Sequence, residues 1–356
     1  MTYAYDSAGL LTGITLPGDK TVTYQYDRSK RLTRVADSAG NFAVYRYDAA
    51  GFPVSASVSG GPVTIYQYDS AHRLRAVVST GPDGKPLAAY RYTLDAAGNR
   101  TSVSALDPAA AVAAPGDNTF RFDAANHPSS SGDGRSYRYD ARGNLIAVDG
   151  ARPATLVYDA FGRLQGIDAG SSTSNTYDSA GLRSARTVNG AVRRFVYDLS
   201  GTRPRVVMEA DESNAPIAWY VYGLGLLWKV AADGTTYFYH FDGDGNAVAV
   251  SSAAAGVVNT YQYDSVGRLA SATELVDNPF RARGEAGWVD DGNGLLYANG
   301  VFHFPDVRLT LPASAGPAPP SPGLLPGLLQ KLPGAGPCFL EGVAACEFAT
   351  GRRERR

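Results

Sequence analysis

Aspartate recurs at a constant spacing near the start of the chain, and regularly spaced carboxylates are candidates for metal ligands or catalytic acid pairs. The first four are Asp6, Asp27, Asp48 and Asp69, which lie 21 residues apart (27 − 6, 48 − 27 and 69 − 48). Each follows a tyrosine and precedes a short polar stretch that ends in glycine or a basic residue. A catalytic pair would have surroundings of its own, so we interpret the repeated aspartates as turn caps.

Further copies of this Tyr-Asp mark continue to residue 269, and a fixed period of about 20–50 residues is the signature of a repeat protein. The copies that we single out as structural repeat and turn positions are Tyr26, Asp27, Tyr47, Asp48, Tyr68, Asp69, Tyr139, Asp140, Tyr158, Asp159, Tyr263 and Asp264. A ladder of tyrosines could grip sugars or single-stranded nucleic acid. We expect its first role to be packing across paired strands.

The histidines form no catalytic constellation that the sequence reveals. His72, His127, His240 and His303 are scattered, and His72 stands at a turn position that other copies give to glycine. The chain has no nucleophile elbow, no phosphate-binding loop and no His-Glu-x-x-His motif. We therefore expect a protein that is not an enzyme, with no catalytic residues, no cofactor and no metal site.

The elements that position the aspartates are predicted to be strands. Aromatic and polar residues alternate before the marks, as in Tyr24-Gln25-Tyr26, and period two places the rings on one face. Asp-x-x-Gly then predicts a hairpin turn with a glycine bulge. After it, Arg or Asn is expected to face water while a leucine returns to the apolar face (Leu32, Leu74, Leu145, Leu164 and Leu269). The fold class is therefore all-β, an array of hairpins paired edge to edge.

Composition narrows the function further. The 356 residues are 44% hydrophobic, with 22 tyrosines and a formal charge of −1, so no general affinity for nucleic acid is indicated. No run of about 18 apolar residues predicts a membrane span. The N-terminus lacks the basic and apolar segments of a signal peptide. Either the protein leaves the cell without a cleaved signal, or this start is not that of the complete ancestral protein.

The marks are less regular later in the chain. Residues 105–116 are interpreted as a loop or insertion, and between 198 and 242 the aspartate mark is missing, with Trp219-Tyr-Val-Tyr222 where one would fall. Cys338 and Cys346 lie eight residues apart and could form a disulfide, although two cysteines do not establish an oxidising compartment.

The repeated Tyr-Asp-x-x-Gly-Arg-Leu unit resembles that of Rhs, or YD-repeat, proteins over about residues 1–300. Two later segments, 278–284 and 290–297, resemble the Rhs-associated core that closes the array. The positions that carry this second resemblance are Pro279, Phe280, Arg281, Gly284, Gly294, Leu295 and Tyr297. His240 resembles the histidine of the family's hairpin near the end of the core, where a structural role is expected.

The resemblance implies a curved, spiralling β-sheet that is part of a hollow β-shell. In the family such shells hold a variable C-terminal toxin, and related shells occur in insecticidal toxin complexes and teneurins. We divide the chain into a hairpin array (1–275), a degenerate core segment (276–312) and a Pro/Gly/Ala-rich variable tail (313–356), which we expect to be disordered. A dozen hairpins favour partial enclosure, and the open edge is then expected to pair with another chain or to aggregate.

The expected function is a non-enzymatic scaffold that encloses and delivers a polymorphic toxin. Its partners would be toxin cargo, the remaining shell segments and a secretion apparatus, such as a type VI system used in contact-dependent competition. The protein would be cytoplasmic before export, then secreted or delivered to the cell surface. The alternative is a surface module that binds carbohydrate or a neighbouring cell, with glycans as partners and no nucleic acid.

One segment departs from the family. Where relatives carry paired aspartates for self-cleavage, Phe304 stands at the first position, Pro305 matches, and Asp306 is one residue out of register. The resemblance therefore implies that self-cleavage is lost, and we expect none. The tail is short for a toxin domain, so it is either a spacer or the product of a reading-frame slip, and the chain is expected to be a truncated or orphan copy.

Overall fold

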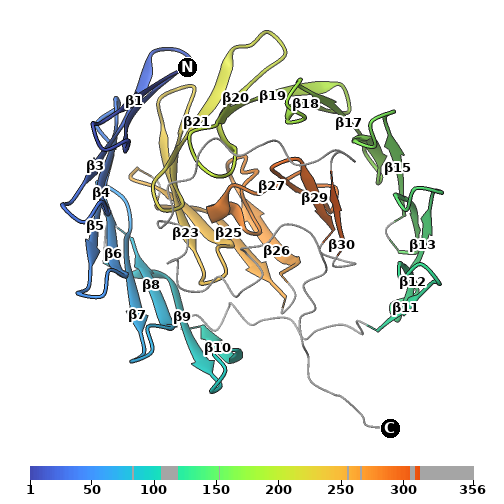
Figure 1. The fold of residues 1–356 in the computed structure, drawn as a ribbon, viewed down its shortest axis with the longest axis horizontal. Helices are drawn as coiled ribbons and strands as arrows, with labels where there is room; N and C mark the ends of the chain where they lie inside the picture. Colours follow the sequence, from blue (N-terminus) through green and yellow to red (C-terminus); the bar gives the residue numbers. More distant parts are fainter. Residues whose placement is uncertain are drawn as a thin grey trace.

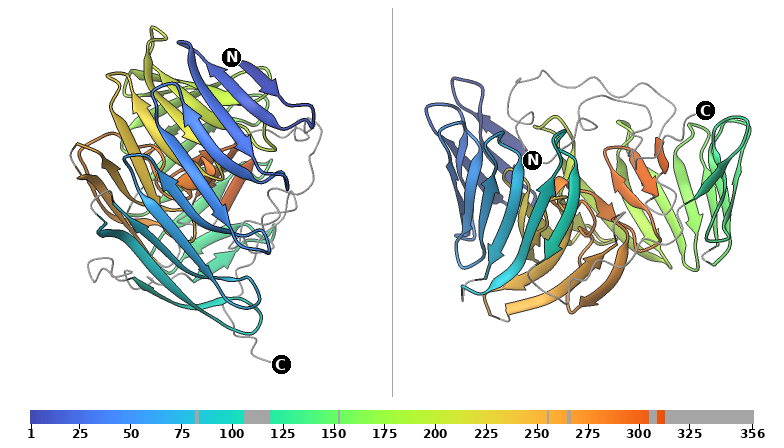
Figure 2. Two further views of the ribbon diagram at one scale, coloured as in Figure 1. Left: turned by 90° about the vertical axis from the view of Figure 1, so that its left-hand side faces the viewer. Right: turned by 90° about the horizontal axis from the view of Figure 1, so that it is seen from below.

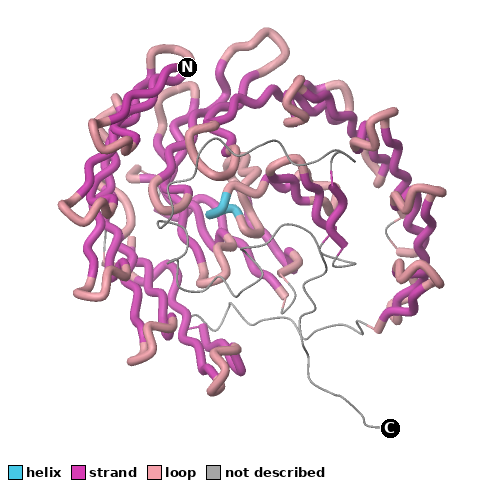
Figure 3. Tube along the Cα trace, viewed as in Figure 1, coloured by secondary structure: helices cyan, strands magenta, loops and turns pink. Residues whose placement is uncertain are grey.

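The computed structural model describes residues 1–81, 84–105, 119–151, 153–254, 256–264, 267–304 and 309–312. The all-β class expected from the sequence is confirmed: strands follow one another almost without interruption, and a single short 3-10 turn occurs in these ranges. Figure 3 shows this composition along the described residues. The expected insertion at residues 105–116 (apart from Ala105), Cys338, Cys346, Asp306 and the tail 313–356 lie outside the described residues.

The first sheet contains ten strands, each hydrogen-bonded antiparallel to the next in sequence. Its strands are β1 (Thr2–Tyr5), β2 (Leu11–Leu16), β3 (Lys20–Tyr26), β4 (Leu32–Asp37), β5 (Phe42–Tyr47), β6 (Pro53–Val58), β7 (Val63–Tyr68), β8 (Leu74–Thr80), β9 (Pro86–Leu94) and β10 (Arg100–Ala105). Strands that pair with their sequence neighbours need only short turns, so the order follows directly from the repeat.

The second sheet contains sixteen strands in the same sequential order. They are β11 (Phe120–Phe122), β12 (Pro128–Ser131), β13 (Ser136–Tyr139), β14 (Leu145–Asp149), β15 (Ala154–Tyr158), β16 (Leu164–Asp168), β17 (Ser172–Tyr177), β18 (Arg183–Val188), β19 (Ala191–Asp198), β20 (Arg205–Ala210), β21 (Pro216–Tyr222), β22 (Leu226–Ala231), β23 (Thr236–Phe241), β24 (Ala247–Ser252), β25 (Gly256–Tyr263) and β26 (Leu269–Glu274).

A third, small sheet follows the array. It contains β27 (Val289–Asp290), β28 (Leu296–Ala298), β29 (Val301–Phe304) and β30 (Leu309–Pro312), and the 3-10 turn η2 (Gly284–Ala286) precedes it. Of the core segment that the sequence predicts (276–312), the structure describes residues 276–304 and 309–312, and from here on the name refers to residues 276–304. Figure 1 shows β27, β29 and β30 inside the space that the two large sheets surround.

The two large sheets form a curved wall. In Figure 1, β1–β10 make one side and β11–β19 the opposite side, while β20–β26 run between them. The right-hand view of Figure 2 shows the strands of residues 236–274 as a floor that joins the two sides. The described part of the chain is thus an open, bowl-like shell with the core segment in its interior.

Side-chain burial alternates with the predicted period of two in strands that have one face of the wall exposed to solvent. In β3, Val22 is buried whereas Thr23 and Gln25 are exposed. In β24, by contrast, all six residues are buried, and β20 has five buried residues of six. These strands are covered on both faces, because β1–β9 pack against one side and the core segment against the other. A run buried on both faces cannot show an alternating sequence pattern.

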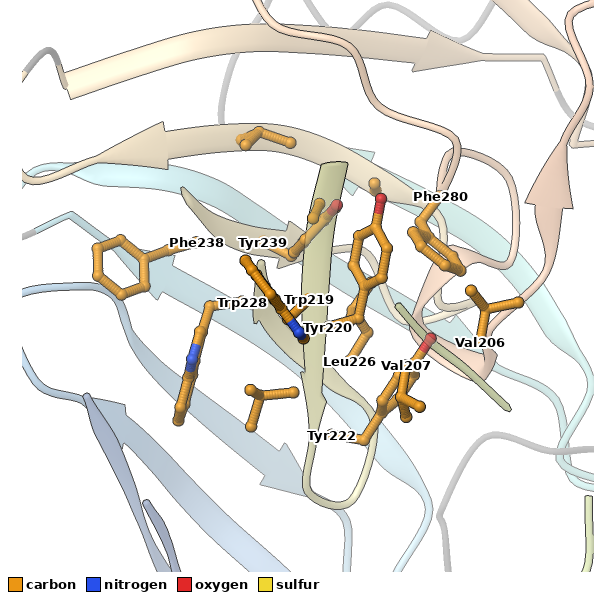
Figure 4. Close-up of a cluster of buried hydrophobic side chains, with 14 of the residues drawn as sticks. Val206, Val207, Trp219, Tyr220, Tyr222, Leu226, Trp228, Phe238, Tyr239 and Phe280 are labelled. Carbon is orange, nitrogen blue, oxygen red and sulfur yellow. The ribbon is translucent and has the colours of Figure 1, made fainter. Parts of the chain in front are cut away.

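The main hydrophobic core therefore lies around β20–β24 (Figure 4). Trp228 is completely buried, and its indole N–H donates to the Asp37 carboxylate on the first sheet at 2.8 Å. Phe280 of the core segment is equally buried and meets the Tyr220 ring edge-on, with the ring centroids 4.6 Å apart. The aromatic residues thus join the two sheets and the core segment into one packed unit.

The sequence places Trp219–Tyr222 where an aspartate mark would fall, and the structure confirms this. Tyr222 ends β21 and pairs with Leu226 across the next turn, with a bulge before Tyr222, as Tyr26 pairs with Leu32 across its own mark. The structure corrects one positional expectation. Leu269 does not return to a buried face: it is 38% exposed, because β26 is the outer strand of its sheet.

Candidate functional site

Each repeat turn is built around the carboxylate of its aspartate. The Asp27 Oδ1 atom accepts hydrogen bonds from the backbone N–H groups of Ser29 and Arg31, both at 2.9 Å. The Asp27 backbone N–H donates to the Arg31 carbonyl and closes the loop. The hydrogen bond from the Arg31 amide is the main cause that holds the pKa of Asp27 below its ordinary value. The same arrangement recurs at Asp69, Asp140 and Asp159.

The third turn residue after the aspartate adopts a left-handed backbone conformation. Glycine fills this position in most copies, for example Gly51 with φ of 91° and Gly162 with φ of 76°. Lys30 and His72 occupy it with φ of 62° and 57°, which non-glycine residues adopt at a cost. The prediction that His72 takes the place of a turn glycine therefore agrees with its backbone geometry.

The basic residue of the repeat does not face water as expected. The Arg31 Nε atom donates to Asp27 Oδ2 at 2.7 Å, and Arg73 and Arg163 make the same contact with Asp69 and Asp159. The Oδ2 atom of Asp27 accepts no hydrogen bond from the backbone of the described residues, so it is available to the Arg31 guanidinium, which lies against the turn. Where Asn replaces Arg, its amide fills the same place, as from Asn144 to Asp140 at 2.8 Å.

The repeat tyrosines link each hairpin to the one before it. The Tyr47 hydroxyl donates to the Leu32 carbonyl at 2.6 Å, and Leu32 stands five residues after the preceding aspartate (27 + 5). The same bond joins further hairpins: Tyr26 to Leu11, Tyr68 to Pro53, Tyr158 to Leu145, Tyr177 to Leu164, Tyr197 to Arg183 and Tyr263 to Ala247. The Arg31 guanidinium also lies 4.8 Å from the centre of the Tyr47 ring. The aspartate of each mark therefore stabilises the turn, and the tyrosine of the mark connects its hairpin to the preceding one.

The hydrogen bond between a repeat tyrosine and the preceding hairpin can be tested by mutation, and another tyrosine of the same array serves as the control. Replacing Tyr158 by Phe removes the hydroxyl from the Leu145 carbonyl, and the free energy of unfolding should fall by about 1 kcal/mol. The Tyr139 hydroxyl is buried and has no hydrogen-bond partner in the described part of the chain, so Tyr139→Phe should be neutral or slightly stabilising. Urea unfolding of both variants checks this, and equal losses would contradict the proposed contact.

The start of the core segment is fixed to the second sheet. The Asn278 side chain accepts hydrogen bonds from the Phe280 backbone N–H and from the Tyr239 hydroxyl, and donates to the Tyr261 hydroxyl. The Arg281 guanidinium forms two hydrogen bonds with the Glu274 carboxylate, at 3.0 and 2.7 Å. The backbone around Pro279 and Arg281 pairs with Asp290 and Ala247. These residues of the predicted core motif thus hold the segment in the shell interior.

The end of the core segment is held by buried charges. Arg183 on β18 is completely buried and contacts both oxygens of the Asp291 carboxylate, and Arg186 contacts the same carboxylate. The Tyr297 hydroxyl accepts a hydrogen bond from the Arg183 backbone N–H at 2.9 Å. The Arg183 guanidinium lies 4.2 Å from the centre of the Tyr297 ring. We call Arg183, Arg186 and Asp291 the charge cluster.

The remaining core-motif positions serve this packing. Leu295 is completely buried, and Gly294 has a φ of 86° that suits glycine in the turn before β28. A Cβ atom on Gly284 would lie 3.0 Å from the Phe280 Cβ, so the small residue permits the close approach of η2. All of these residues lie around the core segment, whereas the Tyr-Asp marks are distributed along the wall.

His240 lies between two sheets and has no access to solvent. Its Nδ1 atom is 2.9 Å from the Ser79 hydroxyl on β8, and its Nε2 atom is 2.8 Å from the Ser251 hydroxyl on β24. Burial lowers its pKa to about 4, so the imidazole is neutral near pH 7. With 1% of its surface exposed, this residue connects strands rather than meeting a substrate.

One carboxyl group in the interior has no polar partner. Glu285 on η2 lies beside a cavity between β5, β7 and β23, and its side chain makes no hydrogen bond or ion pair in the residues that the structure describes. Burial, together with the Asp242 carboxyl group, raises the pKa of Glu285 to about 7. Sequence reasoning named neither this residue nor the members of the charge cluster as site residues, because the contacts of the cluster join residues that lie more than 100 positions apart in the chain.

Other kinds of site are not found in the described ranges. No group of three or more His, Cys, Asp or Glu side chains there has an arrangement that could hold a metal ion. No helix in those ranges is long and apolar enough to cross a membrane. The Asp306 position of the altered self-cleavage segment lies outside them.

Comparison with known families identifies the repeat. The family model described as "Teneurin YD-shell" matches residues 61–280, and the "RHS Repeat" model matches residues 5–42 and 26–63. The tRNA3(Ser)-specific nuclease WapA of Bacillus spizizenii is 28% identical over 265 residues, which are 69% of this chain and 10% of that protein. The tRNA(Glu)-specific nuclease WapA of Bacillus subtilis subsp. natto is 32% identical over 151 residues, 41% of this chain and 6% of its own length.

Solved structures show the same fold. The Tc holotoxin pore of Photorhabdus luminescens superimposes with a TM-score of 0.62 at 16% identity, covering 89% of this chain and 20% of that chain. A complex of TcdB2 with TccC3 gives a TM-score of 0.62 at 16% identity, covering 92% and 21%. The described sheets therefore correspond to about a fifth of those longer chains.

Proposed function

The chain belongs to the teneurin YD-shell family, and from this premise we propose that it forms part of the wall of a hollow β-shell that carries a polypeptide toxin. Its partners are then the toxin chain and further wall segments, and delivery is to the outside of the producing cell through a secretion apparatus. The chain spans about a tenth of the length of the WapA relatives. Complete enclosure therefore requires more wall than these residues supply.

The observation that carries the proposal is the path of the chain. The wall consists of hairpins in strict sequence order, and β30 ends at Pro312 inside the space that they surround (Figure 1). A polypeptide joined after Pro312 would start in the interior, beside the core segment. A sequential wall can also be lengthened by any number of hairpins without a change of topology.

The sheet edges suit extension of the wall. Strands β10 and β26 are outer strands of their sheets, so one side of each has no hydrogen-bonded neighbour among the described strands. All six residues of β26 are exposed. Outer strands of this kind readily pair with another strand, and we propose that further wall segments occupy them.

We also propose that the wall has no enzymatic activity of its own. Phe304 stands where the resemblance places the first aspartate of the self-cleavage pair. The buried His240 is engaged by two serines and is closed to solvent. An intact chain on mass spectrometry after long incubation is expected, and a fragment that ends near residue 312 would contradict this part of the proposal.

The carbohydrate-binding alternative gains no specific support. It needs rows of outward-facing tyrosines, but the repeat tyrosines are partly buried and their hydroxyls bind backbone carbonyls of the preceding hairpin. The most exposed aromatic residues of the described wall are Phe161, Phe122 and Tyr5, which lie in separate places along the sequence.

Protection of an attached segment tests the wrapper function. A flexible reporter with one cleavage site for a specific protease is joined after Pro312 in place of the tail, and the same reporter is joined before Met1 in a second protein. We expect cleavage after Pro312 to be slower than cleavage before Met1, since the wall of the open shell restricts the directions from which a protease can reach the site. Equal rates at the two positions would overturn the proposed enclosure.

A further inference from the structure

A small cavity of about 40 Å³ lies between the first sheet, the β21–β22 turn, β23 and η2. Aromatic rings form much of its lining, contributed by Tyr45, Tyr66, Tyr239 and Phe241. The Glu285 side chain reaches it from η2, and no other carboxyl group lines it. The cavity therefore combines several aromatic rings with a single acid, a combination that neither the repeat nor the packing of the wall requires.

The position of Glu285 is fixed by its surroundings. Its backbone N–H donates to the Gly245 carbonyl at 3.1 Å. Two glycines leave room for the side chain: a Cβ atom on Gly225 would lie 2.4 Å from the Glu285 Cγ, and one on Gly245 would lie 3.2 Å from its Oε2. Any larger residue at Gly225 would displace the Glu285 side chain, so the absence of a side chain at Gly225 is what leaves space for this glutamate.

The carboxyl group is costly in this position. Its pKa of about 7, raised by burial and by Asp242, means that the folded protein disfavours the ionised form. No hydrogen bond or ion pair of the described residues offsets this cost. A half-buried acid that has no polar partner among the described residues and faces a cavity is a candidate for ligand binding rather than for structural support.

The chemistry of the lining selects the ligand. An ionised carboxylate repels anions, and a divalent metal would lack further ligands, since Asp242 already accepts hydrogen bonds from Asp244 and Asn246. Aromatic rings around one negative charge favour an organic cation. We propose that this cavity binds an alkylammonium group, of the size of a lysine side-chain terminus, paired with Glu285 and enclosed by Tyr45, Tyr66 and Phe241.

The charged groups around the cavity set the pH dependence of binding. Asp242, at the end of β23, has its pKa raised to about 6 by burial and by Asp244. Tyr45 and Tyr66 have raised pKa values because of burial, and remain neutral. Both acids are ionised near pH 8 and protonated near pH 5, whereas an alkylamine keeps its charge at both. The affinity should therefore fall as the pH falls.

The test is titration of the whole chain with n-butylammonium, followed by NMR chemical shifts. We expect saturable binding near pH 8, at least fivefold weaker binding near pH 5, and at least tenfold weaker binding of the neutral isostere butan-1-ol. Glu285→Gln should weaken n-butylammonium binding at least tenfold, whereas Glu212→Gln, at an exposed position, should leave it unchanged. Nα-acetyl-lysine methylamide binds as well if the ligand is a peptide lysine, and only n-butylammonium binds if it is a free amine.

Two outcomes would overturn the proposal. One is equal binding of butan-1-ol and n-butylammonium, or no saturable shift with either. The other is full binding by Glu285→Gln. Loss of binding by Glu285→Gln cannot be attributed to unfolding, because the substitution removes a disfavoured charge. The unfolding midpoint of this variant should be higher than that of the original protein near pH 8 and unchanged near pH 4. The proposal does not depend on toxin enclosure, so the protease test and this titration can fail separately.

Discussion

Replacement of Asp291 by asparagine is expected to lower the free energy of unfolding by about 3–5 kcal/mol. Asp291 is the only acid in the described residues that pairs with Arg183 and Arg186. Arg183 is completely buried, and the Nε atoms of both arginines already lack a hydrogen-bond partner. An amide would leave two guanidinium groups in the interior without a counter-charge, and their desolvation would no longer be offset.

Urea unfolding measures this loss, with Asp149→Asn as the matched control. Asp149 pairs with Arg138, and the two side chains are 54% and 64% exposed. Solvent screens such a pair, so the control should change the free energy by less than about 1 kcal/mol. Adding Arg183→Leu to Asp291→Asn should recover part of the loss by removing one unpaired charge. Similar effects of Asp291→Asn and Asp149→Asn would show that the charge cluster does not hold the core segment.

Replacement of Trp228 by alanine should cost about 3–5 kcal/mol. The indole is completely buried on β22, and its N–H binds Asp37 of the first sheet, 191 residues earlier in the chain. A cavity at this place would remove packing from both sheets at once, because the residue lies in the core that joins them (Figure 4). We also expect a lower denaturant m-value or a second transition, as the sheets separate.

Phe161→Ala is the control for this variant. Phe161 is 70% exposed in the turn after Asp159, so its loss should change the free energy of unfolding by about 0.5 kcal/mol or less. A two-state transition with unchanged m-value in Trp228→Ala would contradict the view that Trp228 connects the two sheets, even if the midpoint falls.

The hairpin array could be predicted from the sequence because its interactions are local. Asp27, Ser29 and Arg31 form their hydrogen bonds within five residues, and the tyrosine before the aspartate alternates with polar neighbours. A pattern with so short a range repeats in the sequence whenever it repeats in space. The Rhs-like core segment was equally visible, because Asn278-Pro-Phe-Arg281 and its continuation stand as contiguous residues.

The contacts of the repeat arginines show which interactions a local sequence pattern does not predict. Arg31 is polar and follows the turn position that glycine usually fills, so the sequence predicts that its side chain is exposed to water. In the structure its guanidinium meets the aspartate of its own turn and the tyrosine ring of the next hairpin. The first contact lies within the repeat, but the second depends on how successive hairpins stack, which the residue types alone leave open.

By itself, the sequence determined the all-β class, the hairpin unit, the turn role of the aspartates and the resemblance to YD-shells. Only the tertiary structure decided which distant residues meet. Arg183 and Asp291 are 108 residues apart, Ser79 and His240 are 161 apart, and the cavity beside Glu285 is lined from both large sheets. The curvature of the wall and the entry of the core segment bring these residues together. Both features result from small twists between neighbouring strands that add up over the whole sheet. The sequence of a single repeat therefore does not reveal them.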